Sequence, residues 1–358
     1  RDRSPSRGLG DVYKRQVVGD VLRAHGIEVD EAPIADGGDG TLDVLLAHGF
    51  VARDVEVVDA ALRPRRARIG RRGRSAAIEL AEVCGLVTVA DVPLDGAHRS
   101  TFGLGLAARA ALADGARHLT LCVGGSASVD GGIGLLTGLG FEVLDADGSP
   151  VTADLVGMGR AARIVVPALT PATWQVLVDV RTPMAGRESS AMVFGPQKGL
   201  DPAACIVGEK ALRHWATVLE QTFGVAVREL PGGGAAGGVA AAAHAALGAG
   251  IVSGAATVID MIGLRERLGA CDVVVTGEGS FDAQSLLGKG PGQVCVLAHE
   301  NDRPVFLLAG RADPAAVAAS GAATAYTCVE AAGGLADPLV DPRHWLALAA
   351  ARLAASLD

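Results

Sequence analysis

Three glycine-rich loops in this chain carry acidic residues, a combination suited to phosphate chemistry. They are Asp36–Gly40, Gly124–Gly132 and Thr276–Asp282, and two of them directly follow short apolar runs typical of buried parallel strands. Glycine lets backbone N–H groups approach a phosphate without interference from a Cβ atom. A carboxylate in the same loop can hold Mg²⁺ or take a proton from an alcohol. The loops together predict phosphoryl transfer.

Lysine is rare in this chain, which makes its positions informative. Of four lysines, Lys198 lies in Phe194–Gly199 and Lys289 in Gly288–Pro291, both glycine-containing motifs. A compact ammonium group in such a motif can meet phosphate, and the alternative is a solvated loop lysine.

Three carboxylates are candidates for metal or proton chemistry. Asp179 ends an apolar run and precedes a turn, where it could serve as a base or metal ligand, or could simply cap the turn. Glu278 and Asp282 lie four residues apart across a strand-to-helix turn. Both could face one ion, or Asp282 could cap the next helix.

Neither of two common nucleotide-binding sequence motifs, the dinucleotide-binding glycine loop and the P-loop, is complete in this chain. The segment Gly103–Ala108 has the letters of a dinucleotide-binding loop, but polar residues 97–101 precede it where a strand is required, so a plain helix is favoured. The P-loop pattern fails at Lys289, because Ala283 replaces its first glycine and Gly290 its serine or threonine. A kinase of this sequence is therefore not a P-loop kinase.

Composition indicates a globular protein. The net charge of −8 argues against a nucleic-acid surface, and no apolar stretch is typical of a membrane span. Six scattered cysteines without a C-x-x-C pair fit reduced thiols and predict a cytoplasmic protein. The eight histidines show no ligand spacing.

Residues 1–16 fit poorly with the chain after Val17 and resemble a translated sequencing adapter. We therefore expect a non-native leader there.

Alternation of apolar runs and amphipathic segments predicts α/β structure. Helices are expected at Val17–His25, Thr41–His48, Phe102–Asp114 and 201–223, and strands at Glu28–Ala32, Leu119–Val123, Gln175–Val178, Asp272–Thr276 and Val305–Ala309. Alternating residues between Val51 and Leu80 indicate antiparallel strands. The glycine run Pro231–Gly238 predicts either a phosphate-facing helix N-terminus or a tight packing seam.

The motifs resemble, in order, those of the bacterial type I glycerate kinase family. They are Ala35–Thr41, Gly124–Gly132, Phe194–Gly199, Pro231–Gly238 and Thr276–Gln284. The resemblance implies ATP-dependent phosphorylation of D-glycerate, at the 2-hydroxyl to give 2-phosphoglycerate. It also implies two α/β domains, one doubly wound and flavodoxin-like and one mixed, with the active site in the cleft between them. We expect residues 17–70 and 280–358 in the first domain and 71–279 in the second.

On this resemblance each candidate residue receives a role. Asp179 or Asp36 would orient or deprotonate the hydroxyl, and Glu278 or Asp282 would hold Mg²⁺. Lys198 and Lys289 would neutralise phosphate charge, and the glycerate carboxylate would meet Arg311 or the Ser100–Thr101 turn. The expected ATP contacts come from two loops and are Gly124, Gly125, Ser126, Asp130, Gly277, Gly279 and Lys289.

The chain also departs from the family pattern. Asp39 stands where glutamate is usual, Thr182 where asparagine is usual, and residues 1–16 occupy the place of an opening strand and loop. Two alternatives therefore stay open: a non-catalytic nucleotide- or sugar-acid-binding protein, and a kinase of another small hydroxy acid. A homodimer is also left open, and we expect low activity from the chain as written.

Overall fold

The structure is a computed structural model that describes residues 7–286, 290–334 and 340–357. The chain forms two compact units, each with helices and parallel strands, which confirms the predicted two-domain α/β class. The first unit combines residues up to Asp36 with those from Ala255 onward, and the second spans Gly37–Gly254. The division lies at other residues than the predicted domain boundaries at 70/71 and 279/280, which stay a prediction. The boundary at 70/71 would divide β2 (Pro64–Arg72), which pairs with strands on both sides of it in sequence.

The second unit is built on a six-stranded sheet in the order β1-β2-β3-β4-β7-β8. Its strands are β1 (Val51–Val58), β2 (Pro64–Arg72), β3 (Ser75–Glu79), β4 (His118–Cys122), β7 (Thr173–Leu177) and β8 (Gly250–Val252). The β1–β2 and β2–β3 pairs are antiparallel, as the alternation predicted, whereas β3, β4, β7 and β8 run parallel. The mixed sheet therefore has one edge at which four parallel strands end.

Helices and short segments fill the rest of this unit. They are α2 (Thr41–Ala47), α3 (Leu80–Cys84), η1 (Leu86–Val89), α4 (Phe102–Ala113), α5 (Ile133–Leu139), α6 (Leu155–Met158), α7 (Ser190–Phe194), η2 (Pro196–Lys198), α8 (Pro202–Phe223) and α9 (Ala235–Leu247), with the small hairpin β5 (Glu142–Leu144) and β6 (Arg163–Val165). Small and branched residues make one continuous core, in which Ile78, Leu121 and Val176 of neighbouring strands are fully buried. This core fixes the strand ends that carry the candidate residues.

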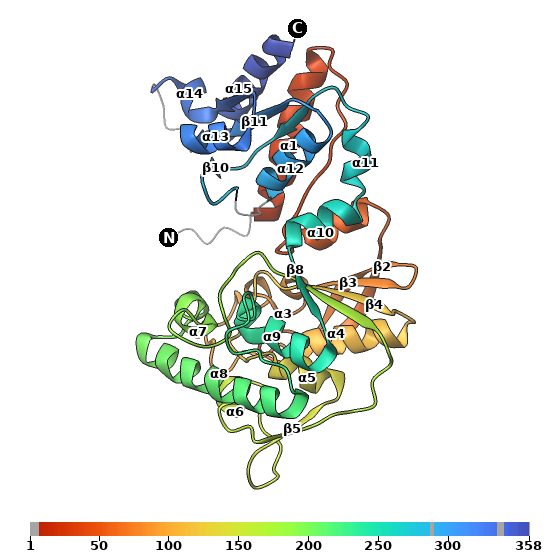
Figure 1. Ribbon diagram of the computed structural model, residues 1–358, viewed down its shortest axis with the longest axis vertical. Helices are drawn as coiled ribbons and strands as arrows, with labels where there is room; N and C mark the ends of the chain where they lie inside the picture. The colour runs from red at the N-terminus through yellow and green to blue at the C-terminus, as the bar shows by residue number, and fades with distance from the viewer. Residues whose placement is uncertain (1–6, 287–289, 335–339, 358) are drawn as a thin grey trace. The chain divides into compact units, whose positions relative to one another are not determined.

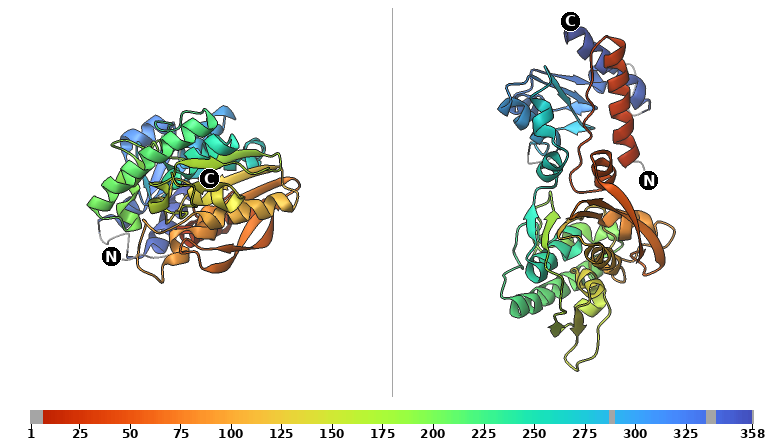
Figure 2. Two further views of the ribbon diagram at one scale, coloured as in Figure 1. Left: turned by 90° about the horizontal axis from the view of Figure 1, so that it is seen from below. Right: turned by 90° about the vertical axis from the view of Figure 1, so that its right-hand side faces the viewer.

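The first unit contains a three-stranded parallel sheet in the order β13-β11-β9, formed by β13 (Thr324–Thr327), β11 (Val305–Ala309) and β9 (Val274–Thr276). Its other elements are α1 (Arg7–Ala24), α10 (Gly254–Met261), α11 (Leu264–Leu268), β10 (Ser280–Phe281), α12 (Gly290–Glu300), β12 (Arg311–Ala312), α13 (Pro314–Ser320), α14 (Cys328–Ala332) and α15 (Pro342–Leu357). The helices α1 and α15, from opposite ends of the chain, lie side by side (Figures 1 and 2) and pack Leu22 and Leu353 with Leu308 of β11.

One region near the start of the chain differs from expectation. The strand predicted at Glu28–Ala32 is wrong, because residues 27–36 are described without a strand. Glu31 instead accepts hydrogen bonds from Arg15 Nε and Arg23, each at 2.7 Å. Charged residues thus attach this segment to α1. That helix begins at Arg7, inside the segment predicted as a leader. Within the described residues no helix is long and apolar enough to cross a membrane.

Candidate active site

The carboxyl ends of four parallel strands bring several candidate residues to one edge of the six-stranded sheet. Glu79 ends β3, Gly124 and Gly125 follow β4, Asp179 follows β7 and Ser253 follows β8. Ligands of α/β proteins commonly bind at such an edge, because loops rather than side-chain layers cover it. This edge is the candidate active site of the second unit.

The Gly124–Gly132 loop, which follows β4, is exposed to solvent only at its first residues. Gly125 is exposed and Gly124 partly so, whereas Ser126, Ser128 and Asp130 are buried. Gly124 also needs its missing side chain, since a Cβ atom there would lie 2.4 Å from the Cα atom of Gly38. The exposed glycines can approach a phosphate, while the rest of the loop is part of the protein interior.

The carboxylate of Asp130 is a buried hydrogen-bond acceptor. Its Oδ2 atom accepts from the backbone N–H and the hydroxyl of Thr101, both at 2.7 Å, and from the N–H of Gly134 at 3.3 Å. Its Oδ1 atom accepts from Gly132 N–H at 3.2 Å and from Ser128 Oγ at 3.4 Å. Burial raises the pKa of Asp130, and the bonds from Thr101 oppose that shift. Its predicted contact with ATP stays a prediction.

The Ser100–Thr101 turn belongs to the same buried cluster. The Thr101 hydroxyl accepts a bond from Leu135 N–H at 2.9 Å, and Ser100 Oγ accepts one from Phe102 N–H at 3.1 Å. Both residues are at most 1 % exposed. These hydroxyls therefore position the first turns of α4 and α5, and their predicted contact with glycerate stays a prediction.

Lys198 is not the solvated loop lysine that the sequence left open. Its side chain is buried, and its Nζ atom donates to Ser126 Oγ at 2.6 Å and to the Ser128 carbonyl at 2.7 Å. Burial lowers the pKa of this ammonium group to about 8, although the Asp130 charge raises it. The structure thus brings Lys198 to Ser126, which is 72 positions away in sequence, and to Asp130 of the same loop.

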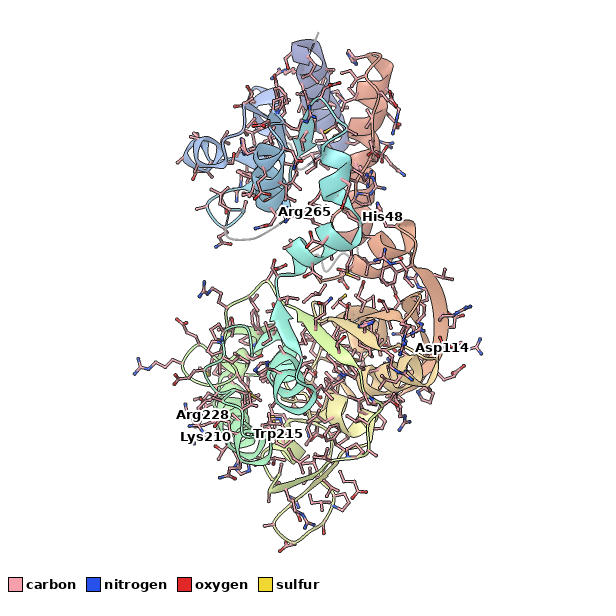
Figure 3. All side chains as sticks on the ribbon, turned by 45° about the vertical axis from the view of Figure 1, so that its right-hand side comes forward. His48, Asp114, Lys210, Trp215, Arg228 and Arg265 are labelled. Carbon is pink, nitrogen blue, oxygen red and sulfur yellow. The ribbon has the colours of Figure 1, made fainter. Side chains whose placement is uncertain are left out.

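Trp215 and the glycine run before α9 hold the far end of this loop. Trp215 lies on α8 (Figure 3), and its Nε1 atom donates to the Gly131 carbonyl at 2.9 Å. Gly131 N–H donates to Gly237 at 2.8 Å, and a Cβ atom at Gly237 would lie 2.4 Å from the Ser128 carbonyl oxygen. Of the two interpretations of Pro231–Gly238, the geometry favours the packing seam.

Asp179 lies at the same sheet edge but outside the Lys198 cluster. Its Oδ1 atom accepts from Gly254 N–H at 3.0 Å and from Ser253 Oγ at 3.3 Å. These bonds connect the end of β7 to Ser253 and Gly254, directly after β8, rather than to the turn that follows Asp179 in sequence. The predicted role of Asp179 as a base stays a prediction.

Glu79 is a buried acid that sequence reasoning missed. Its Oε1 atom accepts from Gly40 N–H at 3.1 Å and its Oε2 atom from Leu42 N–H at 2.7 Å. Asp36 directly precedes the loop that these bonds hold. Burial raises the pKa of Glu79 to about 7, opposed by the two backbone bonds and reinforced by the Asp39 charge. The sequence signal that could have identified Glu79 is its position as a charged residue at the end of the apolar strand β3.

The first unit places a second set of candidates at the carboxyl edge of its own sheet. Gly277, Glu278 and Gly279 follow β9, and Arg311 follows β11. Gly310 N–H donates to the Glu278 carbonyl and Arg311 N–H to the Gly279 carbonyl, both at 3.2 Å. A Cβ atom at Gly277 would lie 1.6 Å from the Leu308 carbonyl oxygen, so close strand packing requires this glycine.

The two acids of this edge have different surroundings. The Oε1 atom of Glu278 is buried and has no hydrogen-bond partner in the part of the chain that the structure describes. Asp282 Oδ1, in contrast, accepts from Gln284 N–H at 2.8 Å and stabilises a local turn. A buried carboxylate oxygen without a donor suits a cation. No group of three or more possible metal ligands occurs among the described residues. Mg²⁺ commonly needs just one or two carboxylates together with phosphate and water, so Glu278 fits this ion.

Two basic residues, Arg311 and Lys289, are the remaining candidates of the first unit. Arg311 is exposed, and its Nε atom donates to Ser280 Oγ at 2.9 Å. Lys289 lies outside the described residues.

Comparison with known proteins shows the family of this chain. The chain is 34% identical over 290 residues to the glycerate 2-kinase of Escherichia coli, covering 78% of this chain and 75% of that protein. It is 32% identical to the glycerate kinase of Bacillus subtilis, covering 93% of this chain and 89% of the relative. A crystal structure of a candidate glycerate kinase 2 from Salmonella typhimurium matches with a TM-score of 0.81 at 32% identity, covering 97% of this chain and 94% of that one. The glycerate kinase family model matches residues 14–358, and this chain therefore belongs to that family.

Proposed function

We propose that this chain transfers the γ-phosphoryl group of ATP to the 2-hydroxyl of D-glycerate, giving 2-phosphoglycerate and ADP. The observation that carries the proposal is the family match over residues 14–358. The choice of hydroxyl is supported by the name of the Escherichia coli relative.

The reaction needs positioning and charge neutralisation more than covalent catalysis. The glycerate oxygen forms a bond to the γ-phosphorus as the bond to the β–γ bridging oxygen breaks, and ADP leaves. We assign the hydroxyl proton to Asp179 or Asp36. The backbone of Gly125, Gly277 and Gly279, which are exposed, would meet phosphate oxygens. Gly124, the fourth glycine assigned to ATP, would hold the loop in place, because its N–H donates to the Gly37 carbonyl.

Lys198 would act from beneath the loop in this scheme. Its ammonium is buried below Ser126 and Ser128, so its charge stabilises phosphate through the low-dielectric interior and through loop geometry. Asp130 fixes the same loop. Arg311, which is exposed, is the better partner for the glycerate carboxylate than Ser100 or Thr101, whose hydroxyls accept backbone bonds.

Mg²⁺ bound at Glu278 would neutralise charge on the β- and γ-phosphates. We expect activity to disappear on chelation by EDTA and to return with added Mg²⁺. Glu278→Gln should raise the Mg²⁺ concentration needed for half-maximal rate about 10-fold or more, because a neutral amide binds the ion more weakly. Asp282→Asn is the matched control and should change it little. Equal effects of the two variants would contradict the assignment of Glu278.

An ADP-release assay with a panel of small hydroxy acids tests the proposed function. We expect turnover with D-glycerate near an ordinary enzyme rate of about 10 s⁻¹ for a fully active protein, and phosphorus NMR should identify 2-phosphoglycerate. Preference for another acid would support a different hydroxy-acid kinase. Tight ATP binding without turnover would support the non-catalytic alternative. Light scattering of the same sample measures the molar mass in solution and so distinguishes a homodimer from a monomer.

A further inference from the structure

Glu79 uses both carboxylate oxygens to hold one loop. The residue ends β3 and is 6% exposed. Its bonds to Gly40 N–H and Leu42 N–H meet the loop at two points around the start of α2. Charged acceptors make stronger hydrogen bonds than neutral ones, so the ionised form restrains the loop most firmly.

The loop held in this way lies against the exposed glycines of the β4 loop. Gly124 N–H donates to the Gly37 carbonyl at 3.2 Å. A Cβ atom at Gly125 would lie 3.3 Å from Asp39 Oδ1, and one at Gly37 would lie 2.6 Å from Leu177 Cβ. Residues at the ends of β3, β4 and β7 thus meet one glycine loop. A change at Glu79 is therefore transmitted directly to Gly124 and Gly125.

The charges around Glu79 come from several elements. Asp39 lies in the held loop and Glu82 on α3, and both raise the pKa of Glu79. The guanidinium of Arg68 on β2 forms ion pairs with Glu82 at 3.2 Å and with Asp43 of α2 at 3.1 Å. Its positive charge offsets the negative charges of Glu82 and Asp43. The thiol of Cys122 on β4 also faces Glu79, and burial raises its pKa, so it is neutral. Glu79 itself has two backbone donors and no ion-pair partner within the described residues.

We propose that Glu79 is a positioning residue for phosphoryl transfer: its carboxylate places the Gly37–Gly40 loop, and with it Asp39, against Gly124 and Gly125. The inference deepens the proposed function and rests on it for the identity of the reaction. Glu79 contacts protein backbone rather than substrate in this role. Asp36, a proposed proton acceptor, directly precedes the loop in the chain.

Hydrogen exchange of the substrate-free protein tests the hold on the loop. In Glu79→Gln the amides within residues 37–47 should exchange about 10-fold faster, because the amide group has one acceptor oxygen for two donors. Glu56→Gln is the matched control: it removes an exposed acid on β1 that bonds Arg66 and should leave residues 37–47 unchanged. In the wild type the same amides should lose protection from pH 8 to pH 6, after correction for intrinsic rates, because protonation weakens the two bonds to the loop while the carboxyl stays buried. This local opening differs from global unfolding, which hydrates Glu79 and therefore responds to pH with the opposite sign. The wild-type measurement keeps the test available if the variant misfolds.

Steady-state kinetics test the link to the reaction. Glu79→Gln should lower kcat about 10-fold and remove the fall in kcat of the wild type as the pH drops through about 7. A purely structural role would change the melting temperature and leave the pH profile of kcat in place. The assay uses whichever hydroxy acid the substrate panel identifies.

The outcomes separate this inference from the proposed function. Unchanged exchange at residues 37–47, or an unchanged pH profile in an active Glu79→Gln enzyme, would overturn the role of Glu79. Faster local exchange with a flattened pH profile would support it. Turnover of an acid other than glycerate would overturn the substrate assignment alone and leave the Glu79 test intact. Binding of ATP without turnover of any acid would overturn both.

Discussion

At the scale of single residues, this site depends on charged groups that are buried in the protein interior. Lys198 and Asp130 are both buried, and each is surrounded by hydrogen-bond partners from the same loop. Burying a charge is costly unless bonds compensate, so these groups hold the loop firmly when their bonds are intact. The cost of that arrangement appears in their pKa values, which shift towards the neutral forms.

Replacement of Lys198 should reveal its double role. Lys198→Met should lower kcat by roughly 10²-fold. It should also change the melting temperature, because the variant leaves Ser126 Oγ and the Ser128 carbonyl without their donor while it removes a buried charge. Steady-state kinetics and thermal unfolding measure the two effects. Lys210→Met is the matched control, since Lys210 is exposed on α8 (Figure 3). Near-normal kcat in Lys198→Met would contradict its part in the reaction.

At the scale of elements, the glycine loop that follows β4 is positioned by the helices around it. The Gly124–Gly132 loop contacts α8 through Trp215 and the start of α9 through Gly237. The helix assigned as α9 contains left-handed residues at Ala236–Gly238, so its first turn is bent. That bend brings glycine backbone into contact with Ser128, and a side chain would prevent it.

Gly237→Ala should therefore destabilise the protein strongly. The residue has φ +75° and a Cβ atom would lie 2.4 Å from the Ser128 carbonyl oxygen. We expect a loss of about 2–4 kcal/mol from left-handed strain and steric overlap together. Gly248→Ala is the matched control, with φ +66° and open space around the Cβ position, and should cost about 1 kcal/mol from strain alone. Denaturant unfolding compares the variants. Equal losses would show that the seam tolerates a methyl group.

At the scale of the whole molecule, stability should depend on pH through two buried groups with opposite signs. Glu79 has a folded pKa of about 7, above its ordinary value of 4.5, so the folded state holds the proton more tightly and stability falls as the pH rises from 4.5 to 7. Lys198 has a folded pKa of about 8, below its ordinary 10.5, so stability rises as the pH increases from 8 to 10.5.

Each group should contribute about 3 kcal/mol across its window. Denaturant unfolding of the wild type and of Glu79→Gln between pH 4.5 and 7 measures the first contribution, and Lys198→Met between pH 8 and 10.5 measures the second. We expect each substitution to flatten the slope in its own window and to leave the other window unchanged. A Glu79→Gln protein with the wild-type slope below pH 7 would show that this carboxyl is ionised in the folded state at ordinary pH.

Local sequence signals were sufficient for much of the fold. The apolar run Val305–Ala309 forms β11 at those bounds, and the helix expected at Phe102–Asp114 is α4, Phe102–Ala113. Such elements depend on periodicity and propensity, which neighbouring residues determine. The strand expected at Glu28–Ala32 failed because Glu31 bonds Arg15 and Arg23 instead of entering a sheet. Strand pairing needs a partner, which local sequence does not specify.

The sequence by itself determined the family and the chemistry, since ordered glycine motifs with acidic residues are local patterns. Only the tertiary structure decided which of those residues are buried and what they bond. Asp130 meets Thr101, Lys198 meets Ser126, and Glu79 meets Gly40, with 29 to 72 residues between the partners. Burial and hydrogen bonding in the core are set by such distant contacts, which the packing of strands and helices creates and no short motif records.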